Sequence, residues 1–294
     1  MNEMQYPLFE KIGEPTLLVG RKKDFAKFQK WLDLIPNRAS KSRAIIARRK
    51  SGKTVFIQRI FNQLWSQNGQ VIPFYFDIQE KKMWTGDFAI SYFATFASHY
   101  ISFKTRQPHL VTEILNLEQI IEYGRQLGND SLIRDAEIIW NYTEKDSPDL
   151  AWSRAYHAPH VYAGTRNERV LVMIDEFQNI TQYIYPTKDY STPPDETMAG
   201  SFHSVAESKV APMLVTGSYV GWLITIIDKY LEAGRLSLIR MSPYLEQKEG
   251  LEAVYRYAQV YNQPVTNLTA ILLNELCMYD PFFISSVILN DIDD

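Results

Sequence analysis

The chain has 294 residues, of which 46% are hydrophobic, and its formal net charge at pH 7 is −3. This length and apolar share predict a globular protein with a full core, built as one large domain or as one large and one smaller domain. The near-neutral charge excludes a general electrostatic attraction to nucleic acids or acidic membranes.

Cysteine usage and the first residues bear on location. The lone Cys277 excludes an intramolecular disulfide and fits a reducing compartment, so we expect a cytoplasmic protein. Residues 1–13 lack the basic start and apolar core of a signal peptide. Since no run of about 18 apolar residues exists, we expect no membrane-spanning segment.

The first predicted element is an amphipathic helix over residues 23–34, preceded by a loop over residues 15–21. Leu18 and Val19 in this loop are apolar and suit the face of a purine base. The same residues can equally form a plain cap on the core, and the sequence leaves both readings open.

A short buried strand over residues 44–46 and a helix over residues 55–65 flank the most informative stretch of the chain. Strand, tight loop and helix are the context of a phosphate-binding loop. Together with Val55, which opens the helix, the predicted nucleotide-binding residues of this loop are Ala47, Arg48, Arg49, Lys50, Ser51, Gly52, Lys53 and Thr54.

The residue types in this loop match phosphate chemistry. Backbone N–H groups and the helix dipole create positive potential at the start of the helix, and Gly52 lets the backbone approach phosphate oxygens. Lys53 can reach the β and γ phosphates, and the Thr54 hydroxyl can bind Mg²⁺. Ala47 replaces the usual first glycine, at a cost of about 1 kcal/mol if that position needs a positive φ. The alternative is an ordinary basic turn between a strand and a helix.

The middle of the chain continues an α/β pattern. We predict a strand over residues 71–78, a helix packed by its aromatic residues over 88–103, and two helices within 115–142. Residues 148–168 are weakly patterned, and we expect His157 and His160 there to be ordinary loop histidines rather than zinc ligands. Basic residues between 38 and 53 favour loop charge and the phosphate site over a nucleic-acid patch.

Two carboxylates follow a second strong apolar run. Residues 170–174 predict a buried central strand that ends in Asp175 and Glu176. Ligands of open α/β sheets lie at the carboxyl ends of the strands. We therefore expect Asp175 to hold Mg²⁺ and Glu176 to polarise the water that attacks the γ-phosphate. The alternative is a strand that merely ends in polar residues.

The remaining elements complete the sheet and add helices. An exposed loop over 181–197 and a short helix over 198–208 lead to a strand over 211–218, where Thr216 or Ser218 contacts the γ-phosphate or water, or Ser218 caps a helix over 219–230. A strand over 236–241 follows. Helices over 251–261, 267–278 and 281–289 predict a small lid, which divides the chain into an α/β domain, 1–244, and a helical lid domain, 245–294.

In their order along the chain, these stretches resemble the AAA+ superfamily of P-loop ATPases. The resemblance is strongest to STAND-type signalling ATPases of the archaeal ATPase group, which are related to the origin-recognition initiators. Its carriers are Val19-Gly20-Arg21, the phosphate-binding octet, Ile174-Asp175-Glu176-Phe177-Gln178, Thr216-Gly217-Ser218, Gly234-Arg235, residues 241–245 and Asp280-Pro281-Phe282-Phe283-Ile284.

The resemblance implies a five-stranded parallel sheet flanked by helices, a helical lid, and Mg-ATP between them. It places Val19 in the adenine-side loop, and Pro281 resembles the proline of a Gly-x-Pro motif in the lid, although Tyr279 stands where that glycine usually is. Arg235 falls near an arginine that senses or stabilises the γ-phosphate, in its own chain or from a neighbouring subunit. A surface pair between Arg235 and an acid is the alternative.

The expected function is a nucleotide-dependent switch with slow Mg-ATP hydrolysis, coupled to self-association or to a protein partner. Its predicted catalytic residues are Glu176, Lys53 and Arg235, and its predicted metal ligands are Thr54 and Asp175. One alternative is a DNA-associated ATPase that uses the basic residues between Arg38 and Lys50. Another is a module that binds nucleotide with little hydrolysis, which the departure at Ala47 suggests.

Overall fold

A five-stranded parallel sheet forms the centre of the computed structural model, which describes residues 4–232 and 234–289. The strand order is β2-β4-β6-β1-β7, and every neighbouring pair is parallel. The predicted α/β class and all five predicted strands are therefore confirmed. The strands are β1 (Arg43–Ile46), β2 (Val71–Asp77), β4 (Arg169–Asp175), β6 (Met213–Gly217) and β7 (Ser237–Arg240).

Burial follows the sequence pattern of each strand. The continuous apolar runs of β4 and β6 occupy central positions, where both faces of a parallel sheet are covered. Pro73 lies within β2, at one edge of the sheet, where the backbone donor that proline lacks is not needed by a second neighbour.

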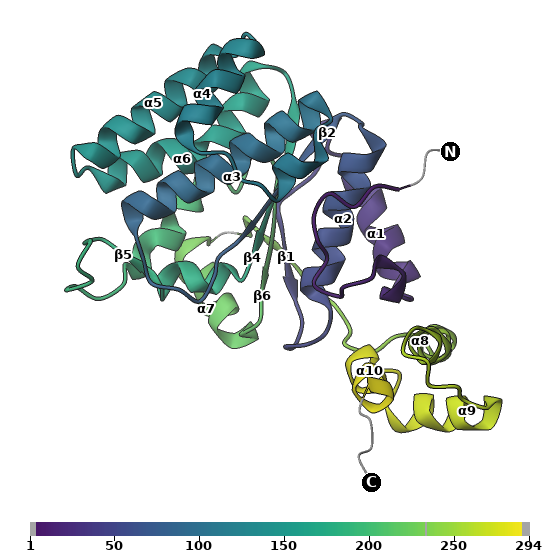
Figure 1. Cartoon of the computed structure of the whole chain (residues 1–294). Helices are drawn as coiled ribbons and strands as arrows, with labels where there is room; N and C mark the ends of the chain where they lie inside the picture. Colours follow the sequence, from purple (N-terminus) through teal and green to yellow (C-terminus); the bar gives the residue numbers. More distant parts are fainter. Residues whose placement is uncertain (1–3, 233, 290–294) are drawn as a thin grey trace.

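Helices cover both faces of the sheet. Figure 1 shows α1 and α2 on one side and α3 to α6 on the other. None of the helices in the described part of the chain is both long and apolar enough to cross a bilayer. The helices within residues 4–232 are α1 (Lys22–Leu32), α2 (Lys53–Gln67), α3 (Thr85–Thr105), α4 (Leu117–Gln126), α5 (Asp130–Glu144), α6 (Pro148–Thr165) and α7 (Val220–Tyr230).

The aromatic side chains of α3 pack into the core, as expected. The ring of Tyr92 lies edge-on to Phe74 of β2 at 5.1 Å between centroids, and Phe88 lies 5.7 Å from Phe76. Such edge-to-face pairs add a little to the free energy of burying the rings themselves. These contacts fix α3 across the edge strand β2.

Three local predictions were wrong: the loop expected over residues 148–168, the loop expected over 181–197 and the helix expected over 198–208. Residues 148–165 form the helix α6, whose apolar residues meet both α3 and α5, so it lacks the one-sided pattern of a surface helix. His157 and His160 therefore lie on a helix, and burial lowers the pKa of His160 to about 3. No group of three or more His, Cys, Asp or Glu residues that could hold a metal ion occurs among residues 4–232 and 234–289.

The loop predicted over 181–197 is partly ordered into a second sheet. Its strand β5 (Ile184–Tyr185) pairs in parallel with β3 (Met83–Trp84), and Ile184 is buried. Instead of a helix over 198–208, the chain forms a short 3₁₀ segment, Glu196–Phe202. The other 3₁₀ segments are Pro15–Leu17, Pro108–Val111 and Phe177–Thr181.

The last three helices have a hydrophobic cluster of their own. They are α8 (Gln247–Val260), α9 (Asn267–Leu276) and α10 (Pro281–Leu289), in close agreement with the predicted ranges. Leu17 and Val19 from the N-terminal loop belong to this cluster. The N-terminal loop thus ties these helices to the rest of the chain, and Figure 1 shows them beside the end of the sheet from which α2 starts.

Candidate functional site

The loop between β1 and α2 contains two residues with a left-handed backbone. Lys50 and Gly52 adopt positive φ values of 64° and 82°, whereas Ala47 does not have a positive φ. A Cβ on Gly52 would meet no atom within 4 Å, so glycine is needed there for its left-handed backbone rather than for space. The alanine at the first loop position therefore carries no backbone strain.

The start of α2 is open to an anion. Gly52 caps the helix without a side-chain hydrogen bond, and no acidic residue lies in the first turn. Intrahelical bonding begins with the Phe56 amide, which donates to the Gly52 carbonyl. The amides before Phe56 lack helical partners, and the helix dipole adds positive potential at the same point.

Lys53 lies inside the loop that it follows. Its ammonium donates to the carbonyls of Ala47 at 3.0 Å and of Arg48 at 2.9 Å, and the residue is only 5% exposed. Burial lowers the pKa of Lys53, and the charges of Glu176 and Asp175 oppose this shift. The two strand-end carboxylates and this lysine thus form one electrostatic unit.

Asp175 is fully buried at the end of β4. Its carboxylate accepts hydrogen bonds from the hydroxyls of Thr216 and Tyr75 and also from Thr54. Burial raises the pKa of Asp175, while the hydrogen bonds from Thr216 and Thr54 oppose the rise. A carboxylate and a hydroxyl in contact are oxygen donors of the kind that Mg²⁺ prefers, so this pair fits the predicted metal site.

Glu176 is held in one orientation by three donors. Its carboxylate accepts from the amide and the hydroxyl of Ser218 and, at 2.6 Å, from the Gln178 side chain. Burial alone would raise the pKa of Glu176, but these hydrogen bonds and the charge of Lys53 outweigh it, so the pKa is lowered. Glu176 itself has a positive φ of 52°. Ser218 therefore binds Glu176 and does not cap α7.

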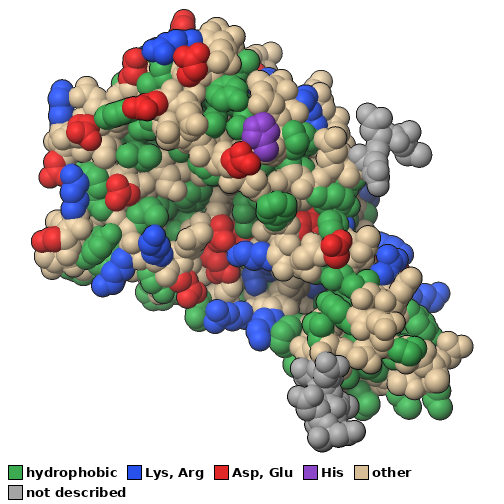
Figure 2. Space-filling model, in the orientation of Figure 1, with side chains coloured by type: hydrophobic (Ala, Val, Ile, Leu, Met, Phe, Trp, Pro, Cys, Tyr) green, Lys and Arg blue, Asp and Glu red, His purple; other side chains and the backbone are tan. Residues whose placement is uncertain are grey.

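A cavity of about 440 Å³ joins the loop to the C-terminal helices. Val19, Pro281 and the loop residues from Lys50 to Val55 line it, whereas Ala47, Arg48 and Arg49 are not among the described residues that do. The predicted role of these residues in nucleotide binding stays a prediction. Figure 2 shows Lys and Arg side chains gathered near the junction with these helices. Sequence reasoning missed Lys11 and Tyr257, which also line the cavity and carry no recognisable motif.

Thr216 does not line this cavity; it is fully buried and reaches the site only through Asp175. Its predicted contact with phosphate or water stays a prediction.

Arg21 connects three parts of the site. Its guanidinium donates to the Ser51 carbonyl at 2.7 Å and to the Ser242 carbonyl at 2.8 Å. Its backbone amide donates to the Glu249 carboxylate of α8 at 3.0 Å. The sequence marked this arginine only as part of Val19-Gly20-Arg21, but the structure shows that it fixes the phosphate loop to the connection that leads into α8.

The other cations of the loop turn towards neighbouring elements. Arg48 forms an ion pair with Asp280, and the Lys50 ammonium lies 4.2 Å from the centre of the Phe282 ring. Arg49 lies over the ring of Tyr219. Two of the loop cations are thus bound by residues at the start of α10, which the sequence did not predict.

The basic residues between 38 and 53 do not form one patch. Arg38 and Arg43 lie at the amino end of β1, whereas Arg48 and Lys53 lie beyond its carboxyl end. Four strand residues at about 3.3 Å each separate the two groups. We therefore do not propose a nucleic-acid interface from these residues.

Arg235 lies away from the loop. It precedes β7, which is parallel to β1, so it sits at the amino edge of the sheet, opposite the phosphate loop. It donates to the Glu232 carbonyl at 2.6 Å and lies 3.9 Å from Glu207. Its predicted catalytic role within the same chain is therefore corrected, and a role towards a neighbouring subunit stays a prediction.

Removal of Arg48 is expected to destabilise α10. Asp280 is fully buried, so Arg48→Ala leaves a buried carboxylate without its cation, at a cost of about 3 kcal/mol. The loss of stability should appear as faster amide hydrogen exchange in α10, because the helix unfolds locally more often. Arg49→Ala, which removes only an exposed contact with Tyr219, is the matched control.

Addition of Asp280→Asn to Arg48→Ala should recover part of the loss, because the uncompensated charge is then gone. Equal exchange rates in α10 for wild type and Arg48→Ala would show that the pair does not hold the helix.

Comparison with solved structures supports the fold. No family model matches the sequence, and no curated protein matches it. Among solved structures, the chain is similar to the Walker-type ATPase PABY2304 of Pyrococcus abyssi, with a TM-score of 0.58 and 15% sequence identity over 96% of this chain and 69% of that chain. The chain has the P-loop NTPase fold. At this identity the similarity establishes the fold alone.

Proposed function

We propose that the chain is a Mg-dependent ATPase that works as a nucleotide switch. The observation that carries the proposal is the meeting of Lys53 and Thr54 with Asp175 and Glu176 beside one cavity. A helix start without an acidic residue, a buried lysine and two strand-end carboxylates are the parts that phosphoryl transfer requires. The structural similarity to PABY2304, a Walker-type ATPase, supports it.

Each residue has a distinct part in the proposed reaction. The free amides at the start of α2 and the Lys53 ammonium bind the phosphates, and Thr54 with Asp175 would hold Mg²⁺. Bound Mg²⁺ supplies positive charge that offsets the charge of the phosphate oxygens. Glu176, ionised and oriented by Ser218 and Gln178, accepts the proton of the attacking water.

The switch would couple the nucleotide to the C-terminal helices. We propose that residues 245–294 act as a lid on the α/β domain, 1–244, because loop and lid residues share the cavity and Arg48 and Lys50 contact the start of α10. A phosphate that attracts Arg48 competes with Asp280 for this cation. The STAND-type resemblance implies that such a change controls assembly or a protein partner, in the cytoplasm.

The test is nucleotide binding and phosphate release by the purified chain with Mg²⁺. Saturable ATP binding with slow release of phosphate supports the proposal, and comparison with GTP examines the base preference, which rests on the resemblance. Tight ATP binding without phosphate release would instead identify a binding module. Absence of nucleotide binding with Mg²⁺ would overturn the proposed function.

Ser218→Ala is expected to move the acid limb of the pH profile to higher pH. The hydroxyl of Ser218 helps to lower the pKa of Glu176, so its removal raises that pKa towards the ordinary value of a glutamate. Because the base must be ionised, activity is then lost at a higher pH as the solution is acidified. The measurement is kcat/KM for ATP against pH, and an unshifted acid limb would contradict this role of Ser218.

A further inference from the structure

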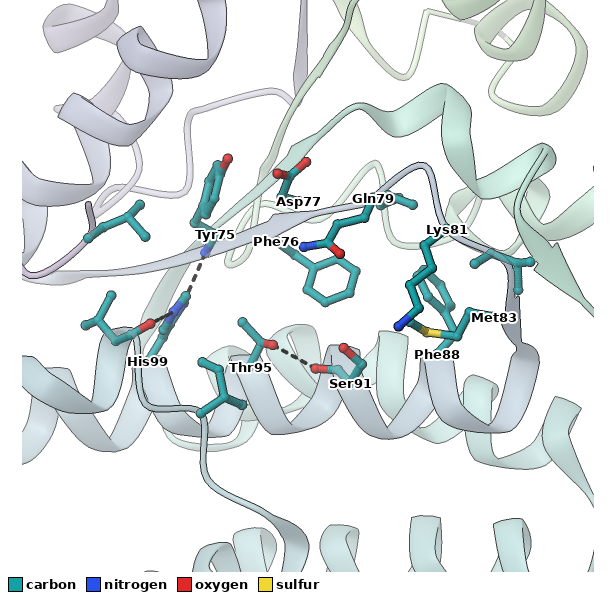
Figure 3. Close-up of a pocket in the computed structure, with 15 residues that line it drawn as sticks. Tyr75, Phe76, Asp77, Gln79, Lys81, Met83, Phe88, Ser91, Thr95 and His99 are labelled. Atoms are coloured by element: carbon teal, nitrogen blue, oxygen red, sulfur yellow. Dashed lines mark hydrogen bonds between the residues drawn. The ribbon is translucent and has the colours of Figure 1, made fainter. Parts of the chain in front are cut away.

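A second cavity lies between the end of β2 and the helix α3 (Figure 3). Its volume is about 310 Å³, within the range of small ligand sites, and it shares no lining residue with the nucleotide cavity. The reaction proposed above does not use it.

One wall of this cavity is the β2 edge of the sheet, where no further strand is paired within the described residues. The Tyr75 amide points away from β4 and donates to His99 Nδ1 of α3 at 3.3 Å. The Ile78 amide, in contrast, donates to the backbone carbonyl of Asp175 in β4 at 3.1 Å. Because backbone groups alternate along a strand, the Asp77 amide also points away from β4. Among residues 4–232 and 234–289, no acceptor is recorded for it. Such an edge is a template for one more strand.

The opposite wall of the cavity can accommodate the side chains of an added strand. Ser91 and Thr95 lie one turn apart on α3 and face the cavity in Figure 3, and the Thr95 hydroxyl donates to the Ser91 carbonyl at 2.8 Å. Phe76, Phe88 and Ile184 add apolar surface. A backbone edge opposite small hydroxyls and apolar side chains suits an extended chain with small or apolar residues.

The charge at the end of the cavity selects one end of such a chain. Lys81 follows β2, is exposed and lines the cavity, and no ion pair is recorded for it among the described residues. Figure 3 shows its side chain extending towards α3. Among the described residues that line the cavity, the one carboxylate is that of Asp77, which is already paired with Lys11 at 3.0 Å. An incoming carboxylate therefore meets a free cation.

We propose that this cavity binds the carboxyl-terminal end of an extended peptide as an added strand beside β2. Its carboxylate lies at Lys81, beyond the carboxyl end of β2 at Asp77, so the peptide runs parallel to β2 and extends the all-parallel sheet. The Asp77 amide donates to the peptide backbone, and Lys81 distinguishes a free carboxyl end from a chain that continues.

The experiment uses the full ¹⁵N-labelled chain and two probes. One is a pool of N-acetylated tetrapeptides of Ala, Val and Leu with free carboxylates, and the other is the same pool with C-terminal amides. We expect the free-acid pool to shift the amide resonance of Asp77 more than that of Ile78, whose amide is already bonded. The amidated pool should bind more weakly.

The adjacent residues Lys81 and Lys82 allow a matched pair of variants. Lys81→Gln should weaken binding of the free-acid pool about three- to fivefold, as expected for a partly exposed ion pair. Lys82→Gln should leave it unchanged, since Lys82 lies over the ring of Tyr185. Ser91→Leu should block binding by filling the cavity.

An unmoved Asp77 resonance with the free-acid pool at millimolar concentration would overturn the proposal. Equal binding of the acid and amide pools would also overturn it, because the carboxylate would then not be recognised.

Discussion

Glu176→Gln is expected to slow phosphate release about 10²- to 10³-fold while it changes ATP affinity little, because a positioned general base contributes an effect of this size. Glutamine keeps the volume of the side chain but cannot take the proton of the attacking water. The lowered pKa of Glu176 and its bonds to Ser218 and Gln178 indicate an ionised and oriented base in the wild type. Steady-state phosphate release and equilibrium ATP binding measure the two effects separately.

Glu207→Gln is the control for this substitution. It makes the same chemical change on an exposed acid at the opposite edge of the sheet, next to Arg235, so turnover should stay at the wild-type value. If Glu176→Gln released phosphate as fast as wild type, Glu176 would not be the base. If both variants lost activity equally, the substitution would be acting through global charge or folding.

The sequence alone was enough to predict those features that depend on neighbouring residues in the chain. Buried strands, the phosphate loop and the two carboxylates after β4 were found because each depends on a short run of residues and on the rule that parallel strands end at one edge. The same rule places residues before a parallel strand at the opposite edge. Applied to Arg235, it could have corrected the predicted catalytic role before the structure was known.

Other features depended on distant contacts. The pairing of Arg48 with Asp280 joins residues 232 positions apart, and no spacing rule connects them. The helix α6 was missed because it packs against both α3 and α5 and contains Pro159, so neither periodicity nor propensity marks it. The cost assigned to Ala47 depended on a backbone angle that only the structure could supply.

Lys53→Ala is expected to weaken ATP binding about 100-fold, because loss of the cation from a buried pair with the phosphates, as proposed here, typically costs 2–5 kcal/mol or more. The lysine is the first residue of α2, is 5% exposed and interacts electrostatically with the carboxylates of Glu176 and Asp175. Its removal takes away the cation that offsets these carboxylates, so a triphosphate meets greater repulsion as well as one ligand fewer. Titration with a fluorescent ATP analogue measures the change.

Lys50→Ala separates this effect from the general charge of the loop. Lys50→Ala removes the same charge from the same loop. Because the Lys50 ammonium lies over the Phe282 ring, we expect this substitution to change ATP affinity less than about threefold. Both variants should retain the wild-type circular dichroism spectrum, since neither lysine belongs to the main hydrophobic cluster. Wild-type affinity in Lys53→Ala would place the phosphates elsewhere. A comparable loss in Lys50→Ala would show that total loop charge, rather than the buried position of Lys53, determines binding.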